Sequence, residues 1–84
     1  MAVDVTVRYF AGARAAAGTG EEAVSLPDGA TVRTLAEHLT SRHGPELARV
    51  LAAASFLVDE VTRPPEHPLA GAAAVDVLPP FSGG

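Results

Sequence analysis

The first segment of the chain alternates apolar and polar residues. In Val3–Phe10, valines at every second position are separated by polar side chains, and this period of two is typical of a strand with one buried face. We expect the side chains of three valines to face the core: Val3, Val5 and Val7. The next segment, Ala11–Gly18, is rich in alanine and has little bulk. It predicts a short helical turn that ends near Gly18.

The strongest helical pattern begins after Thr31. Its apolar stripe, at the spacing of one helix face, consists of Val32, Leu35, Ala36 and Leu39. Thr31 precedes this stripe as an N-cap, and Gly44 followed by Pro45 ends the helix. Pro45 also suits the first turn of a second short helix over residues 45–54.

The remaining segments predict strands and turns. Glu21–Leu26 reads as a second strand that closes at the turn Pro27–Gly29. Ser55–Arg63 resembles a hairpin with its bend at Asp59 and Glu60. Residues 64–71 are a loop, and Ala73–Leu78 is the final strand.

This order of elements favours an α+β domain in which one main helix covers one face of a mixed sheet. With the first and last strands as central, parallel neighbours, the architecture is the ubiquitin-like β-grasp. We expect this domain to span residues 1–78 and a flexible, extended tail to span residues 79–84. The predicted core includes Val5, Val7, Leu35, Leu39, Val58 and Val77.

Composition narrows the possible functions. A chain of 84 residues holds one small domain. With no cysteine, it has no disulfide, no thiolate metal site and no cysteine nucleophile. The net charge of −4 argues against a nucleic-acid partner. The sequence shows neither a membrane span nor a signal peptide, so we expect a cytoplasmic protein.

The C-terminal residues predict a tail that enters a partner. The prolines stiffen its exit from the last strand, and the small residues allow a close approach of the backbone. Phe81 is placed to anchor the tail in a pocket of the partner. The predicted partner-binding residues of this tail are Pro79, Pro80, Phe81, Ser82 and Gly83.

The predicted reactive group is the carboxylate of Gly84. A carboxylate is a poor electrophile, so useful chemistry requires activation, most simply as an acyl-adenylate made from ATP. A sulfur or nitrogen nucleophile can then attack. The bland alternative is a terminus without a chemical role.

Both ends of the sequence resemble one family. "LPPFSGG" is similar to the C-terminal signature of the MoaD/ThiS sulfur carriers, and "VTVRYFAGARAAAGT" resembles the MoaD branch, the small subunit of molybdopterin synthase. The positions that carry the second resemblance are Tyr9, Phe10, Ala11, Arg14 and Gly18. Departures from the family pattern are Ala15, where an acidic residue is frequent, and Leu69–Ala73, where the family has an acidic turn.

The resemblance implies a mechanism. A ubiquitin-activating-like adenylyltransferase adenylates Gly84 with ATP, and a sulfur donor converts it to a thiocarboxylate. The tail then enters the large subunit of molybdopterin synthase, a heterotetramer, and the sulfur attacks cyclic pyranopterin monophosphate. The catalytic side chains belong to the large subunit, so the chain is not an enzyme alone and binds no cofactor.

Other functions remain open. The same tail suits a sulfur carrier for thiamine, cysteine or thiolated tRNA, a ubiquitin-like modifier joined to lysines, or an interaction module whose glycines have no role. Phe10 is a further partner-binding candidate, on the outer face of the sheet beside residues such as Phe56 or Leu57, or it packs under the short helix. We expect exposed histidines rather than a metal site, and solvated acids at Glu21-Glu22 and Asp59-Glu60.

Overall fold

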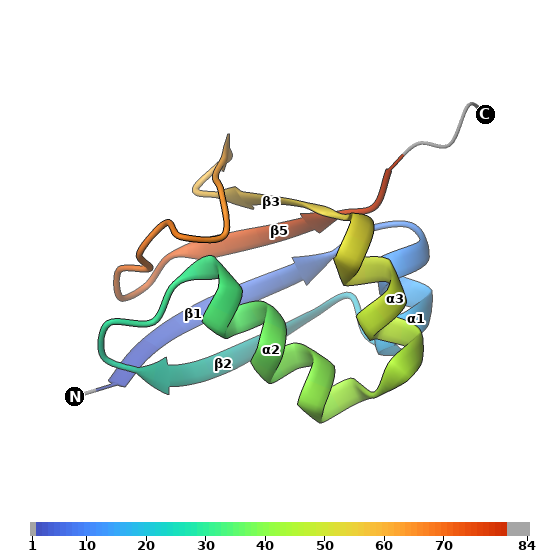
Figure 1. Ribbon diagram of the computed structural model, residues 1–84, viewed down its shortest axis with the longest axis horizontal. Coiled ribbons are helices and arrows are strands. Elements are labelled where there is room, and N and C mark those ends of the chain that lie inside the picture. Colours follow the sequence, from blue (N-terminus) through green and yellow to red (C-terminus); the bar gives the residue numbers. More distant parts are fainter. Residues whose placement is uncertain (1, 81–84) are drawn as a thin grey trace.

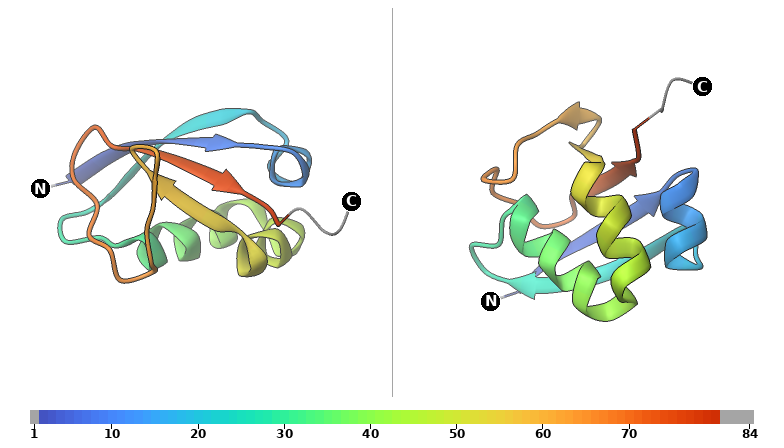
Figure 2. Two further views of the ribbon diagram at one scale, coloured as in Figure 1. Left: turned by 90° about the horizontal axis from the view of Figure 1, so that it is seen from above. Right: turned by 45° about the vertical axis from the view of Figure 1, so that its right-hand side comes forward.

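The computed structural model describes residues 2–80. Five strands form one mixed sheet, and helices α2 and α3 lie against one of its faces while α1 lies at one end (Figures 1 and 2). In chain order the elements are β1 (Ala2–Tyr9), α1 (Gly12–Ala17), β2 (Glu21–Pro27), α2 (Val32–His43), α3 (Pro45–Ala53), β3 (Ser55–Val58), β4 (Val61–Thr62) and β5 (Ala74–Leu78). The predicted helices and strands are therefore confirmed.

The first and last strands meet at the centre of the sheet. The strand order is β2-β1-β5-β3-β4, and β1 pairs in parallel with β5, with Thr6 opposite Ala74 and Tyr9 opposite Val77. Strands β2 and β3 flank this pair and run antiparallel to it. This arrangement is the predicted ubiquitin-like β-grasp.

The core lies between the sheet and the helices. The alternation in β1 buries its valines on the helix side, as expected, and α2 adds an apolar stripe that packs on them. All six core residues predicted from the sequence are buried: Val5, Val7, Leu35, Leu39, Val58 and Val77. Helix α3 completes the layer with Leu47 and Leu51.

Local sequence explains where α2 begins and ends. The backbone N–H of Thr34 donates to Thr31 Oγ1 at 3.3 Å, and the N–H of Thr31 donates to Thr34 Oγ1 at 3.1 Å. This reciprocal pair satisfies two N–H groups that the first turn leaves without helical partners. At the other end Gly44 has a φ of +96°, which favours glycine, and Pro45 starts α3.

The bend between β3 and β4 falls at Asp59 and Glu60, as predicted. Both residues have positive φ angles, +48° and +73°, the conformation of a tight hairpin turn whose twist matches its strands. Asp59 is also tied to the neighbouring strand, because its Oδ1 accepts a hydrogen bond from the N–H of Ala74 at 3.0 Å. This bond helps to hold the turn in place without glycine.

Candidate functional site

The helices leave the opposite face of the sheet uncovered (Figure 2). One row of outward-facing residues crosses four strands, because Arg8 pairs with Glu21 on one side and with Asp76 on the other, and Asp76 pairs with Leu57. In the next row Leu78 lies opposite Ser55. We call this surface the outer face and define it by Thr6, Arg8, Leu57, Asp76 and Leu78.

Arg8 and Asp76 hold the middle of the outer face together. The Nε of Arg8 donates to Asp76 Oδ1 at 2.6 Å, and its Nη2 donates to Oδ2 at 3.1 Å. The Asp76 side chain is only 12% exposed. These hydrogen bonds, with the carboxylate charge, raise the pKa of Arg8. Both charges are therefore paired with each other within the sheet.

Phe10 lies at the end of this face, next to the end of the last strand. Its N–H donates to the carbonyl of Val77 at 3.3 Å, and the residue is 40% exposed. Of the neighbours suggested for Phe10 by the sequence, Leu57 faces outward, whereas Phe56 packs against the core. The suggestion of Phe56 is therefore wrong, because the register opposes Phe56 to buried Val77.

The tail begins beside Phe10. Strand β5 ends at Leu78, after which Pro79 is half-buried and Pro80 is exposed. The other predicted tail residues, Phe81, Ser82, Gly83 and Gly84, lie outside the described residues. The geometry thus brings Phe10 together with the root of the tail at one end of the sheet.

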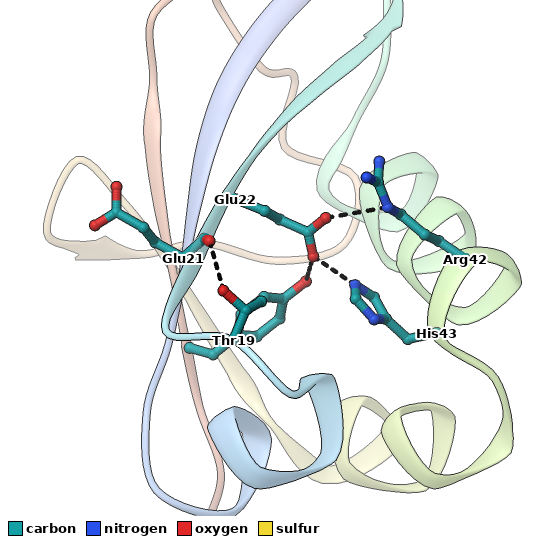
Figure 3. A network of polar contacts seen from close by, with 6 residues as sticks. Thr19, Glu21, Glu22, Arg42 and His43 are labelled. Atoms are coloured by element: carbon teal, nitrogen blue, oxygen red, sulfur yellow. Dashed lines mark hydrogen bonds and ion pairs between the residues drawn. The ribbon is translucent and has the colours of Figure 1, made fainter.

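A second polar cluster lies on the inner side of the sheet (Figure 3). The hydroxyl of Tyr9 donates to Glu22 Oε2 at 2.6 Å, and His43 Nε2 lies 2.5 Å from the same oxygen. Arg42 approaches the other carboxylate oxygen, with its Nε 3.2 Å from Oε1. We call these four residues the Glu22 cluster. They join β1 and β2 to the last turn of α2.

The Glu22 cluster corrects two expectations. The side chains of Glu22 and His43 are only 12% and 15% exposed, whereas the sequence suggested a solvated acid and an exposed histidine. The signal that was missed is the alternation of β2, in which Glu22 shares the inward face with Val24 and Leu26. A carboxylate at such a position needs hydrogen-bond partners.

The charges of the cluster stabilise one another. Burial alone raises the pKa of Glu22, but the hydrogen bonds from Tyr9 and His43 and the charge of Arg42 outweigh burial and lower the pKa. Burial, followed by the bond to Glu22, raises the pKa of Tyr9. The phenol therefore stays protonated at neutral pH. We assign the cluster a structural role.

Two further observations concern metal binding and membrane-spanning helices. Among residues 2–80, no three histidine, aspartate or glutamate side chains are placed to hold a metal ion together. None of the helices in the same part of the chain has the length and apolar character needed to cross a membrane.

Comparison with known proteins agrees with this geometry. The model of the ThiS family matches residues 7–84. The chain belongs to the ThiS family. None of the curated protein sequences matches this ThiS-family protein.

Solved structures share its fold. A putative molybdopterin converting factor subunit 1 from Pyrococcus furiosus is 33% identical, with a TM-score of 0.83 over 94% of this chain and 99% of that chain. Small archaeal modifier protein 1 from Methanosarcina acetivorans is 26% identical, with a TM-score of 0.83 over 100% of this chain and 99% of that one. A complex of subunits 1 and 2 of molybdopterin-converting factor from Helicobacter pylori matches with 20% identity and a TM-score of 0.67 over 98% and 100% of the two chains. At this identity the last match supports the fold only.

Proposed function

We propose that this ThiS-family protein is a sulfur carrier that serves as the small subunit of molybdopterin synthase. In this role Gly84 becomes a thiocarboxylate and donates its sulfur to cyclic pyranopterin monophosphate. The observation that carries the proposal is the family match over residues 7–84, which extends through the terminal Gly83-Gly84 pair. The molybdopterin branch is supported by the Pyrococcus furiosus protein, which is similar over nearly its full length.

The position of β5 supports delivery of the tail to a partner. This strand is held between β1 and β3, so the root of the tail is fixed relative to the outer face. Phe10 and Leu78 lie at that same end, and partly exposed apolar side chains are suited to the centre of a protein interface. A partner that binds this end of the outer face would therefore receive the tail beside its own docking surface.

The chemistry requires activation of Gly84. A carboxylate oxygen attacks the α-phosphate of ATP, pyrophosphate leaves, and an acyl-adenylate forms. A sulfur nucleophile then attacks the acyl carbon and AMP leaves. The proposal assigns these steps to an adenylyltransferase and a sulfur donor, and assigns sulfur transfer to a large synthase subunit within a heterotetramer. ATP is bound by the activating enzyme, and a cytoplasmic location is part of the proposal.

Mass spectrometry tests the carrier role. Incubation with an adenylyltransferase, ATP and a sulfur donor should replace one oxygen of Gly84 by sulfur, with the corresponding gain in mass. A chain that lacks Gly84, and a chain extended by one alanine, are the controls and should remain unmodified. Acquisition of sulfur by the extended chain at another position would contradict the proposal.

A second assay tests the acceptor. The thiocarboxylated protein is mixed with a large subunit and cyclic pyranopterin monophosphate, and molybdopterin is measured. Gly83→Val should prevent transfer, because a side chain next to the reactive end obstructs a narrow channel, while the melting temperature of the free domain stays the same. If the wild type binds the large subunit but yields no molybdopterin, thiamine, cysteine or tRNA thiolation becomes the better assignment.

The likeness to small archaeal modifier protein 1 favours a second candidate, a ubiquitin-like modifier. In that role activated Gly84 forms an amide with a lysine of another protein. The chain itself has no lysine, so it cannot form polymers through its own side chains. Expression of a tagged protein followed by mass spectrometry of lysine conjugates separates this candidate from the carrier.

A further inference from the structure

An open pocket of about 510 Å³ adjoins Phe10. Its walls come from three segments: residues 8–10 at and just after the end of β1, Arg14 of α1, and residues 19–21, which lead into β2. The pocket therefore lies at the end of the sheet where the tail begins. Phe10 and Arg8 belong both to this pocket and to the surface around the tail.

The exposed side chain of Arg14 lies against Gly20 within the pocket. A Cβ atom added to Gly20 would lie 3.2 Å from Arg14 Nη2, 3.3 Å from Nε and 3.4 Å from Cζ. These nearly equal distances show that the flat side of the guanidinium rests on Gly20. Gly20 is itself fixed to β1, because its carbonyl accepts a hydrogen bond from the N–H of Tyr9 at 2.9 Å.

The polar side chains that line the pocket differ in whether they have partners within the protein. Arg8 is paired with Asp76, and the hydroxyl of Thr19 donates to the backbone carbonyl of Glu21 at 3.0 Å. Within residues 2–80, Arg14 forms no ion pair. Of the two arginines that line the pocket, Arg8 has a carboxylate partner, and Arg14 has none among the described residues.

We propose that the pocket receives a carboxylate side chain of the partner protein that accepts the tail. This inference rests on the proposed function, because it assumes a partner beside the tail. A guanidinium is planar and presents paired N–H donors that match the two oxygens of a carboxylate. Exposed Phe10 borders the same pocket, so the partner segment carries an aspartate or glutamate next to an apolar side chain. Arg14 is then a docking residue, and Gly20 is its positioning residue.

A titration without the partner tests the pocket directly. Nitrogen-15-labelled protein is titrated with N-acetyl-glutamate N-methylamide, and the neutral glutamine analogue is the matched control. The Arg14 Nε–H and Gly20 N–H signals should shift and saturate with the glutamate compound alone. The shifts should be absent in Arg14→Gln and retained in Arg49→Gln, since Arg49 is exposed on α3, outside the pocket. Equal shifts with both compounds, or saturation by inorganic phosphate alone, would overturn the proposal.

Binding of the large synthase subunit tests the pocket in the complex. We expect Arg14→Gln to weaken affinity about fivefold to tenfold, because a hydrogen-bonded charge pair is lost, and to reduce the dependence of affinity on salt. Gly20→Ala should weaken affinity less than Arg14→Gln does, because its Cβ shifts the end of a flexible side chain by only a few tenths of an ångström and its backbone φ is not in the left-handed region. Arg49→Gln should bind like the wild type.

The outcomes separate this inference from the proposed function. If Phe10→Ala loses affinity but Arg14→Gln does not, the docking surface stands and the carboxylate pocket is wrong. If the wild type binds no large subunit, the proposed function is wrong, and the titration alone decides whether the pocket recognises carboxylates. Melting curves of all variants check that each protein is folded.

Discussion

Arg8 and Asp76 stand opposite each other across the parallel strands β1 and β5, and two hydrogen bonds of 2.6 and 3.1 Å join their side chains. The residues are 68 positions apart in the sequence. The pair therefore links the beginning of the chain to the strand that carries the tail, on the face that we propose for docking.

Removal of Arg8 alone should destabilise the protein. In Arg8→Met the mostly buried carboxylate of Asp76 loses its partner, and an unpaired charge is more costly than an absent pair. The double change Arg8→Met with Asp76→Leu should therefore be more stable than the single Arg8→Met variant. Urea unfolding at neutral pH measures the free energy of unfolding of the wild type, the single variant and the double variant. A double variant less stable than Arg8→Met would show that the carboxylate has other support.

Glu22 should make stability depend on acid pH. Its pKa is lowered in the folded protein, since hydrogen bonds and Arg42 outweigh the effect of burial. Its contribution is therefore complete above the ordinary glutamate pKa of about 4.3 and is lost as pH falls through the lower folded value. Glu22→Gln should cost about 1–3 kcal/mol at pH 7. The difference from wild type should shrink below about pH 4.3.

Unfolding curves of wild type and Glu22→Gln between neutral and strongly acid pH provide the measurement. Glu21→Gln is the matched control, because Glu21 is exposed and points away from the cluster (Figure 3). A constant difference between wild type and Glu22→Gln down to the lowest pH would contradict the assignment of this carboxylate.

The core of α2 should be sensitive to truncation. Leu35 is fully buried between α2 and the sheet, and Leu35→Ala should lower the free energy of unfolding by about 2–5 kcal/mol. Val61 is 48% exposed on β4, so Val61→Ala should change it by less than about 0.5 kcal/mol. Thermal and urea unfolding test both values. Equal losses of stability in the two variants would contradict the burial of Leu35 between α2 and the sheet.

The β3–β4 turn should accept glycine at its second position. Glu60 has a φ of +73°, and glycine adopts this conformation without the steric cost of a Cβ. Glu60→Gly should therefore raise stability by about 0.5–1 kcal/mol. Asp59→Gly should not do so, because it removes the bond to the N–H of Ala74. A melting temperature lower in Glu60→Gly than in wild type would refute the argument.

Most helices and strands can be predicted from the sequence, because the residues that start, stop and orient each of them are close together in the chain. The alternation of β1, the cap at Thr31 and the stop at Gly44 each depend on a few neighbouring residues. The parallel pairing of β1 with β5 came from the order of the elements. The bend at Asp59 was correctly placed, but its positive φ angles are not visible in a sequence without glycine there.

The site was less predictable because it depends on long-range contacts. The partners of Glu22 come from β1 and from the end of α2, and only the folded chain brings them together. In the same way, the contact of Arg14 with Gly20 depends on the course of the loop between α1 and β2. The prediction that Phe56 lies on the outer face is wrong, because the register between β3 and β5 sets Phe56 opposite the buried Val77. The roles of Phe81, Ser82, Gly83 and Gly84 stay predictions.

The central place of β5 has a consequence for synthesis of the protein. A growing chain that lacks Ala74–Leu78 contains β1 and β3 but has no strand to lie between them. Such pairing between distant segments forms late and slowly, because a long loop must close first. The outer face around Phe10 is therefore completed only when the strand next to the tail has left the ribosome. An unfinished chain has neither a complete outer face nor Gly84, so under the proposed function an activating enzyme that recognises both would act only on finished molecules.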